Sequence, residues 1–314
     1  MKRIHVIATG GTIAGKGKNI YDLTDYVSGV VPIADILSDV DDLPNLAQIT
    51  YEDFCQIGSE DMTKAIWLSL AKRVNQLADD ANIDGIVITH GTDTMEETAF
   101  FLNLVTATAK PIVLTGAMLP TTASHPDGPA NLKDAIMVAA DSKALNNNVL
   151  VVMNHNIFSA TGVRKIHSSS VDAFAAPTEQ RLGYVKKQVI WQQQLPKTEM
   201  HFDISQISEL PATEIITVYG DMNVEIVKQM LDLGLNKIVF DCFGNGTMPK
   251  PLVELLAESD GIFISTTQTG SGKAEHSYPN LICGHGYTAK QARIILMLAL
   301  TKTTDKSEMF SYFK

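Results

Sequence analysis

Short runs rich in valine and isoleucine alternate with longer segments of helical periodicity over the first two thirds of the chain. The runs predict β-strands at residues 3–9, 85–89, 111–115 and 149–153. Amphipathic spacing predicts helices between them at residues 61–78, 94–107 and 129–144. Because the strands are apolar on both faces and helices separate them, the pattern is typical of a parallel sheet buried between helices.

A polar, proline-containing stretch interrupts this alternation from residue 191 to residue 212. Such a composition is typical of a connection between domains. Beyond it, the pattern predicts strands at 214–219, 237–242 and 261–266, and helices at 223–233, 249–258 and 288–303. The sequence therefore predicts an α/β fold in three parts: a larger N-terminal domain (1–190) with a mainly parallel sheet flanked by helices, a linker (191–212) and a smaller C-terminal α/β domain (213–314).

The composition is that of a globular protein, with 45% hydrophobic and 19% charged residues among 314. Acidic residues outnumber basic ones, 35 against 25, and the net charge of −10 opposes binding to nucleic acid or to an anionic membrane. The longest apolar run, residues 294–300, is far shorter than the ~20 residues of a membrane-spanning helix. We therefore expect neither nucleic acid nor a membrane as a partner.

The amino terminus and the cysteines indicate a compartment. The basic start at Lys2 and Arg3 runs directly into a predicted strand, without the apolar segment of a signal peptide. Cys55, Cys242 and Cys283 are far apart in the sequence, which fits reduced thiols better than disulfides or a CxxC metal site. We expect a cytoplasmic protein without a bound metal, and we keep an exported mature form, its leader removed, as the alternative.

Polar side chains gather where the predicted strands end, and ligands of open α/β sheets bind at the carboxyl ends of strands. The first strand is followed by a turn that contains Gly10, Gly11 and the hydroxyl of Thr12. The second is followed by Thr92 and Asp93, directly before a helix. Each pattern also has a plain structural explanation, because glycines make tight turns and Asp93 fits a helix N-cap. Taken together, these groups predict one shared crevice at this edge of the sheet.

Lys165 and His90 are the other candidates. Lys165 lies near an apolar position, where a lysine can give up its proton and act as a base, although a solvated charge is the commoner role. His90 follows a strand without a second histidine at metal-ligand spacing, so we expect a packed core residue. The glycines at 10, 11 and 15 lack GxGxxG spacing, which counts against a dinucleotide-binding site.

Two strings of residues resemble the signature motifs of the bacterial L-asparaginase and glutaminase-asparaginase family. They are ATGGTIAG at residues 8–15 and HGTDTMEET at residues 90–98. Shorter segments across nearly the whole chain are similar as well, at residues 57–62, 116–118, 127–129, 244–246 and 291–296. The continuation of the second motif, residues 95–102, resembles the type II members.

The resemblance implies hydrolysis of the side-chain amide of L-asparagine to L-aspartate and ammonia, without a metal or a cofactor. It implies that Thr12 is the nucleophile that forms an acyl-enzyme, and that Tyr26 assists it. It further implies a second hydrogen-bonded triad of Thr92, Lys165 and Asp93. A threonine hydroxyl needs a nearby proton acceptor to act as a nucleophile, so this arrangement suits the chemistry. Which threonine is acylated stays open, and we favour Thr12.

The same resemblance implies how a free amino acid is held. Ser59 and backbone amides would bind the α-carboxylate, and Asp93 and Glu60 would pair with the α-ammonium. Ala117 would contribute backbone at the carboxamide. Glu275 is the candidate for an acidic group supplied by a neighbouring subunit, in a homotetramer built as a dimer of dimers.

The segment at residues 15–29 contains three glycines and lies between Thr12 and a helix expected near Pro32. A flexible segment beside the nucleophile can order over bound substrate and exclude water. We therefore expect a lid here, with an ordinary surface loop as the plainer alternative.

Departures from the family pattern leave the substrate open. Position 60 is Glu where the most asparagine-selective members have Gln, and position 247 is Thr where many relatives have Asn. A glutaminase-asparaginase of broad specificity, which would also accept L-glutamine, is the first alternative. A non-catalytic amino-acid-binding protein on the same fold, a nucleotide-binding domain and an amidotransferase subunit are the others. The candidates Thr12, Thr92, Asp93 and Lys165 are all present, which disfavours a degenerate, non-catalytic site.

Overall fold

The computed structural model describes residues 1–147, 149–193, 200–276 and 278–313. The chain divides into two compact units, Met1–Ser205 and Gln206–Lys314. We call them the first and the second unit. In the described part of the chain, no helix combines the length and the apolar character needed to cross a membrane.

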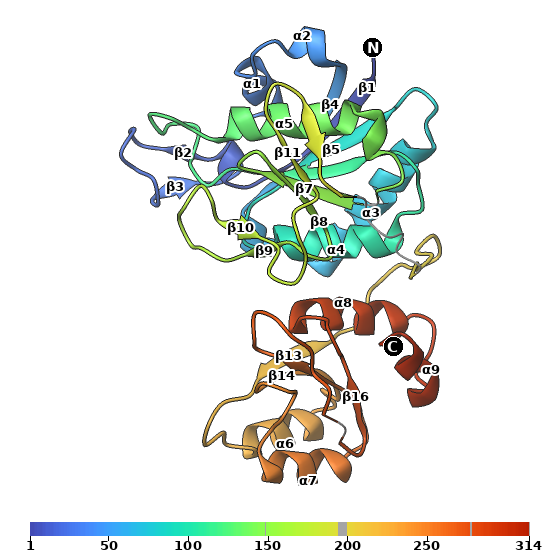
Figure 1. Ribbon diagram of the computed structural model, residues 1–314. Coiled ribbons are helices and arrows are strands. Elements are labelled where there is room, and N and C mark those ends of the chain that lie inside the picture. Colours follow the sequence, from blue (N-terminus) through green and yellow to red (C-terminus); the bar gives the residue numbers. More distant parts are fainter. Residues whose placement is uncertain (148, 194–199, 277, 314) are drawn as a thin grey trace. The chain divides into compact units, whose positions relative to one another are not determined.

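An eight-stranded sheet forms the centre of the first unit (Figure 1). Its order is β12-β11-β8-β7-β6-β5-β1-β4. The strands from β4 to β7 run parallel, and β8, β11 and β12 continue the sheet in antiparallel pairs. The bounds are β1 Arg3–Gly10, β4 Gln48–Ile57, β5 Gly85–Thr89, β6 Ile112–Thr115, β7 Val149–Met153, β8 Asn156–Ser159, β11 Gly183–Val185 and β12 Val189–Trp191.

Helices cover both faces of this sheet (Figure 1). One face carries α1 (Ile33–Ser38), α2 (Leu43–Leu46) and α5 (Gly128–Ala140), and the other carries α3 (Lys64–Asp79) and α4 (Met95–Val105). The second pair is joined by stacked rings of Trp67 and Phe101, whose centroids are 5.4 Å apart. The sheet is therefore the middle layer of three.

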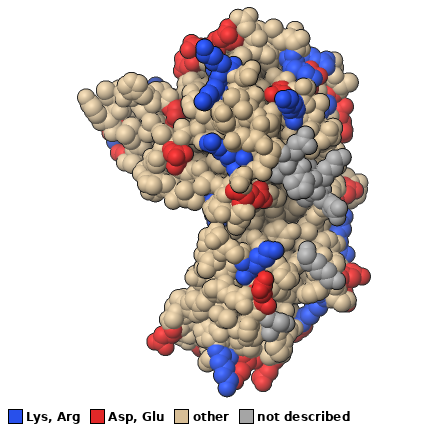
Figure 2. All heavy atoms as spheres, in the orientation of Figure 1, with Lys and Arg blue, Asp and Glu red and all other residues tan. Residues whose placement is uncertain are grey.

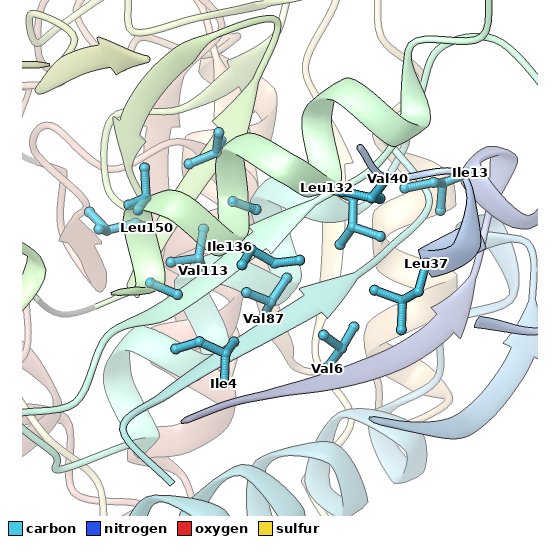
Figure 3. Packing of buried hydrophobic residues seen from close by; sticks show 14 of the residues in the cluster. Ile4, Val6, Ile13, Leu37, Val40, Val87, Val113, Leu132, Ile136 and Leu150 are labelled. Atoms are coloured by element: carbon cyan, nitrogen blue, oxygen red, sulfur yellow. The ribbon is translucent and has the colours of Figure 1, made fainter. Parts of the chain in front are cut away.

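The apolar core under α5 follows the two-residue period of the strands and the 3.6-residue period of the helix. Val87 and Val113 point from neighbouring strands toward Leu132 and Ile136 of α5 (Figure 3). All four side chains are fully buried. Every second strand residue faces this layer and the alternate ones face α3 and α4, which is why the strands are apolar on both faces.

The second unit has a four-stranded parallel sheet in the order β13-β14-β15-β16. The helices α6 and α7 pack with its apolar residues in one cluster, and α8 contacts the sheet as well. The bounds are β13 Glu214–Thr217, β14 Lys237–Cys242, β15 Ile262–Thr267, β16 Leu281–Cys283, α6 Glu225–Asp232, α7 Lys250–Ala257, α8 Ala289–Ala299 and α9 Lys306–Ser311.

The predicted α/β fold is confirmed, with a mostly parallel sheet and helices in the first unit and a smaller parallel sheet in the second. Helix boundaries differ where capping decides them. The helix predicted at 61–78 begins at Lys64, because the Thr63 side chain accepts the Ile66 N–H at 3.2 Å and caps it. The helix predicted at 129–144 ends at Ala140, and a separate 3-10 turn follows.

Several strands have no counterpart among the predicted ones. The longest is β4, an edge strand whose residues are mostly exposed or half-buried, so the alternation that marks a strand is weak there. β8, β11 and β12 are short, at three or four residues. Trp191, at the start of the predicted linker, is the last residue of β12, and residues 194–199 of that linker lie outside the described residues.

Ile136→Ala tests the core under α5. Truncating a fully buried isoleucine leaves a cavity, so we expect a loss of about 2–5 kcal/mol in the free energy of unfolding of the first unit. Urea unfolding followed by tryptophan fluorescence measures it, because both tryptophans, Trp67 and Trp191, belong to this unit. Ile20→Ala is the matched control: Ile20 is 49% exposed, and its truncation should change stability by less than about 0.5 kcal/mol. Equal losses in the two variants would contradict this account of the core.

Candidate active site

The turn after β1 places Thr12 against Tyr26. Gly10 and Gly11 have φ angles of 99° and 79°, which bend the chain away from the strand. Thr12 then opens a 3-10 turn, Thr12–Ala14, and is 7% exposed. Its Oγ1 lies 2.6 Å from the hydroxyl of Tyr26. This contact places next to the threonine hydroxyl a polar side chain that can exchange a proton with it.

Tyr26 belongs to a short hairpin. β2 (Lys16–Gly17) pairs antiparallel with β3 (Tyr26–Val27), and Gly17 lies directly opposite Tyr26. The hairpin occupies most of the segment 15–29 that the sequence predicts as a lid. The hairpin therefore contacts Thr12 through the Tyr26 hydroxyl.

The second cluster joins Thr92, Asp93 and Lys165. Lys165 Nζ donates to Thr92 Oγ1 at 2.8 Å and to Asp93 Oδ1 at 2.6 Å. Thr92 is 5% exposed, whereas the side chain of Asp93 is 64% exposed. The ammonium thus bridges a buried hydroxyl and a carboxylate that reaches solvent.

Lys165 is fixed by its backbone as well as by its side chain. It lies in β9 (Arg164–Lys165), which pairs with β10 (Phe174–Ala175). Its N–H donates to Glu96 Oε2 at 2.9 Å. Glu96 is in the first turn of α4, and Thr92 and Asp93 lie in the loop directly before that helix, so this loop and the helix start hold the two ends of the lysine.

A half-buried guanidinium, that of Arg164, lies next to this lysine in the sequence. Burial lowers the pKa of Arg164, and the attraction of Glu96 and Glu179 opposes that effect. Arg164 Nη1 donates to the carbonyls of Thr161 and Val163 at 3.0 and 2.6 Å. These bonds close the turn that leads from β8 to Lys165.

The structure brings Ser59 to the same loop. Ser59 is 3% exposed, and its Oγ accepts the N–H of Asp93 at 3.1 Å. The hydroxyl of Thr94 donates to the Ser59 carbonyl at 2.8 Å. Glu60 is exposed in the same 3-10 turn, Ser59–Asp61, and its carboxylate lies against Gly58.

Ala117 is fully buried directly beyond β6, in a segment fixed from two sides. Asp127 accepts the N–H groups of Met118 and Leu119 at 2.9 Å each. Asn131 donates to the Gly116 carbonyl at 3.0 Å. The backbone around Ala117 is therefore held rigidly.

Glu275 lies in the second unit and is exposed. Its N–H donates to Asn245 Oδ1 at 2.9 Å. Nearby, Thr247 forms an isolated bridge with Phe243. The contacts of Thr12, Ser59, Thr92, Asp93 and Lys165 lie within the first unit alone.

Three residues that the sequence analysis did not single out hold these loops in place: Glu96, Asp127 and Asn131. Glu96 lies inside the second signature string, and Asp127 begins the DGP segment. Their position within those motifs was the available signal, but a side chain that binds distant backbone leaves no periodic pattern. Among the described residues, no three His, Cys, Asp or Glu side chains gather in a way that could hold a metal ion.

His90 is fully buried behind the loop of Thr92. The Trp67 indole donates to Thr98 Oγ1 at 2.8 Å, so the Thr98 proton is free to point at His90 Nε2, 2.9 Å away. Nδ1 then carries the ring proton and donates to the Gly91 carbonyl at 2.7 Å. A neutral imidazole satisfies every member of this chain, and it fixes the backbone of Gly91 between the two candidate threonines.

Burial lowers the pKa of His90 to about 4, from an ordinary value of about 6.5. The unfolded chain therefore takes up a proton at a higher pH than the folded chain does. The stabilisation that this causes is fully present above about pH 6.5 and is lost as the pH falls toward about 4.

We expect His90 to make the unfolding of the first unit pH-dependent. The free energy of unfolding should fall by about 2 kcal/mol between about pH 6.5 and pH 5. In this range His90 is protonated in the unfolded chain but neutral in the folded one, and roughly 1.4 kcal/mol is lost for each pH unit. His90→Asn should be less stable at about pH 7 but show a flatter decline over this range. Urea unfolding at several pH values measures both slopes, and His125→Asn, at an exposed histidine, is the control. An unchanged slope in His90→Asn would refute the assignment.

Known protein families match this chain over most of its length. Residues 3–197 match the family described as "Asparaginase, N-terminal", and residues 213–313 match the "Glutaminase/Asparaginase C-terminal domain". The chain is 34% identical to L-asparaginase 2 of Bacillus subtilis (strain 168) over 324 residues, which cover 100% of this chain and 86% of that protein. It is 36% identical to the glutaminase-asparaginase of Pseudomonas aeruginosa over 326 residues, covering 100% and 90%.

A solved structure extends the similarity to three dimensions. The crystal structure of a probable cytoplasmic L-asparaginase from Campylobacter jejuni is 37% identical and superposes with a TM-score of 0.95, covering 100% of this chain and 99% of that one. The two motif strings, the fold and these full-length similarities agree. The chain therefore belongs to the asparaginase and glutaminase-asparaginase family.

Proposed function

We propose that this protein is an L-asparaginase that hydrolyses L-asparagine to L-aspartate and ammonia through an acyl-enzyme on Thr12. The family assignment makes the chain an amidohydrolase of the asparaginase family. The observation that carries the finer proposal is the pair of threonine clusters, Thr12 with Tyr26 and Thr92 with Lys165. One hydroxyl can attack the amide, and the other can orient the water that hydrolyses the resulting ester.

In the first step, Thr12 Oγ1 attacks the side-chain carboxamide carbon. An ester bond to the threonine forms, and the amide nitrogen takes up a proton and leaves as ammonia. The 2.6 Å distance to the Tyr26 hydroxyl supports this role, because Tyr26 can accept the hydrogen of Thr12 while the new bond forms. The low exposure of Thr12 supports it further, since a water-poor site strengthens such polar contacts.

In the second step, water attacks the ester and releases L-aspartate, and the proton returns to Thr12. We assign Thr92 and Lys165 to this water, with Asp93 holding the ammonium. The distances of 2.8 and 2.6 Å from Lys165 Nζ support a continuous hydrogen-bonded path from Thr92 to Asp93. The backbone N–H of Thr92 is our candidate for stabilising the oxyanion.

Recognition of the amino acid follows from charge. We assign the α-carboxylate to Ser59 and neighbouring amides, and the α-ammonium to Asp93 and Glu60. The exposure of both residues supports this, because an incoming ligand can reach their carboxylates. The rigid backbone at Ala117 is assigned to the carboxamide.

We further propose a homotetramer, a dimer of dimers, in which Glu275 of a neighbouring subunit completes each site. The exposed position of Glu275 on a loop of the second unit supports an intersubunit role. We also propose a cytoplasmic location, supported by the similarity to the Campylobacter jejuni protein. A relative from Haemophilus influenzae, 36% identical, carries the description "Probable L-asparaginase periplasmic", so an exported form is the alternative.

A glutaminase-asparaginase of broad specificity is the second candidate. Glu60 and the 36% identity to the Pseudomonas aeruginosa enzyme favour it. L-glutamine is longer than L-asparagine by one methylene, which changes the free energy that separates two substrates by only about 1–3 kcal/mol. The volume of the pocket therefore decides between the two amides.

Ammonia release tests the proposed substrate. Purified protein is offered L-asparagine, L-glutamine and D-asparagine in parallel, over a range of concentrations. We expect the highest kcat/KM on L-asparagine, with L-glutamine at least about tenfold lower, as one methylene allows. Comparable values for the two L-amides would assign the protein to the second candidate, and no release from any of them would overturn the enzymatic proposal.

Thr12→Ala tests the nucleophile. We expect kcat to fall by about 10³-fold or more while L-asparagine still binds, because the ester cannot form. Kinetics and isothermal titration calorimetry separate the two effects. Thr108→Val is the control: Thr108 accepts the Lys110 N–H at 3.1 Å in the loop before β6. Normal turnover in Thr12→Ala would show that Thr12 is not acylated.

A further inference from the structure

Two adjacent threonines hold the base of the β2–β3 hairpin. Thr121 donates twice to the Gly15 carbonyl, from its N–H at 2.9 Å and from its hydroxyl at 2.7 Å. Thr122 Oγ1 accepts the N–H of Gly17 at 2.9 Å. These three bonds fix β2 on both sides of Lys16, from a loop more than one hundred residues further along the chain.

The same base supports Tyr26. Gly17, which Thr122 binds, lies opposite Tyr26 in the hairpin register. Gly15, which Thr121 binds, lies under the tyrosine ring so closely that a Cβ there would come within 2.7 Å of Tyr26 Cδ2. A shift of β2 would therefore move the tyrosine, and with it the hydroxyl 2.6 Å from Thr12.

The rest of the hairpin offers little that would hold it in place. Its tip is exposed, Tyr21 by 84% and Ile20 by 49%. The Lys18–Asp25 ion pair at 3.6 Å joins two side chains that are each more than four fifths exposed, so it contributes little. The chain is fixed again beyond the hairpin, where the Val30 N–H donates to the Ala14 carbonyl at 2.8 Å.

The loop that carries the two threonines is itself anchored. Asp127 accepts the N–H of Leu119 at 2.9 Å, two residues before Thr121. Asp127 in turn accepts from Asn131 of α5 at 3.1 Å. The threonines thus project from a segment tied to α5, the same segment that carries Ala117.

We propose that Thr121 and Thr122 are positioning residues that hold the Tyr26 hydroxyl against Thr12. This inference rests on the proposed function, in which Tyr26 assists Thr12. The two threonines touch neither reacting atom. They act through the backbone of Gly15 and Gly17, and so they couple the Ala117 segment to the β2–β3 hairpin.

The isosteric pair Thr122→Val and Thr122→Ser isolates the Gly17 bond. Valine keeps the shape and removes the acceptor, and serine keeps the acceptor. We expect kcat on L-asparagine to fall about tenfold in Thr122→Val, which corresponds to about 1.4 kcal/mol, with a smaller change in KM. Thr122→Ser should stay within about twofold of the wild type.

A double-mutant cycle with Tyr26→Phe shows whether the threonine acts through the tyrosine. Without the Tyr26 hydroxyl there is nothing left to position, so Thr122→Val should not lower the kcat of Tyr26→Phe any further. A full tenfold additional loss in the double variant, or unchanged kcat in Thr122→Val, would overturn the proposal. Thr108→Val, which removes the same kind of hydroxyl acceptor elsewhere, should leave kcat unchanged.

Hydrogen–deuterium exchange of the full-length protein without substrate gives a readout that needs no activity. We expect the peptide spanning residues 16–28 to exchange faster in Thr122→Val than in the wild type, and Thr122→Ser to match the wild type. Equal exchange in all three would overturn the proposal even if the enzyme is active. If Thr122→Val exchanges faster but the wild-type protein releases no ammonia, the threonines still hold the hairpin and the proposed function is refuted.

Discussion

Close contact between backbones at the ends of neighbouring strands is the constraint on which the site depends. A Cβ on Gly11, after β1, would collide with the backbone of Gly91, after β5. A Cβ on Gly91 would come within 2.7 Å of Ser59, in the turn after β4. Because three strand ends nest without side chains between them, Thr12, Ser59 and Thr92 share one small region. Buried His90 holds Gly91 in this arrangement by its bond to the Gly91 carbonyl.

Around this centre, the polar groups are held from more than one side, which suits chemistry that needs fixed geometry. Lys165 is bound at its ammonium by Thr92 and Asp93 and at its backbone by Glu96. Half-buried Arg164 is its neighbour in the chain, and carbonyl partners and the attraction of Glu96 offset the cost of its partial burial. Basic and acidic side chains are interspersed on the face shown in Figure 2.

The predicted fold agrees with the structure where periodicity is strong. β5 and β14 have the predicted bounds, because fully or mostly apolar runs next to turn residues leave little ambiguity. β4 was missed because an edge strand is half-solvated and carries no clear alternation. Its omission matters for function, since the turn that carries Ser59 and Glu60 follows it directly. Helix ends differed by a few residues wherever a single capping bond decided them.

The sequence by itself determined the fold class, the strand ends that carry Thr12 and Thr92, and the family, because these depend on local periodicity and on contiguous motifs. Only the tertiary structure decided which distant groups meet. Lys165 binds Thr92 across 73 positions, and Gly17 binds Thr122 across 105. Such bonds join side chains or backbone atoms that share no periodic pattern, and they form only after strands pair and loops close. The physical reason is that hydrogen bonds depend on distance and direction in space, which local sequence does not encode.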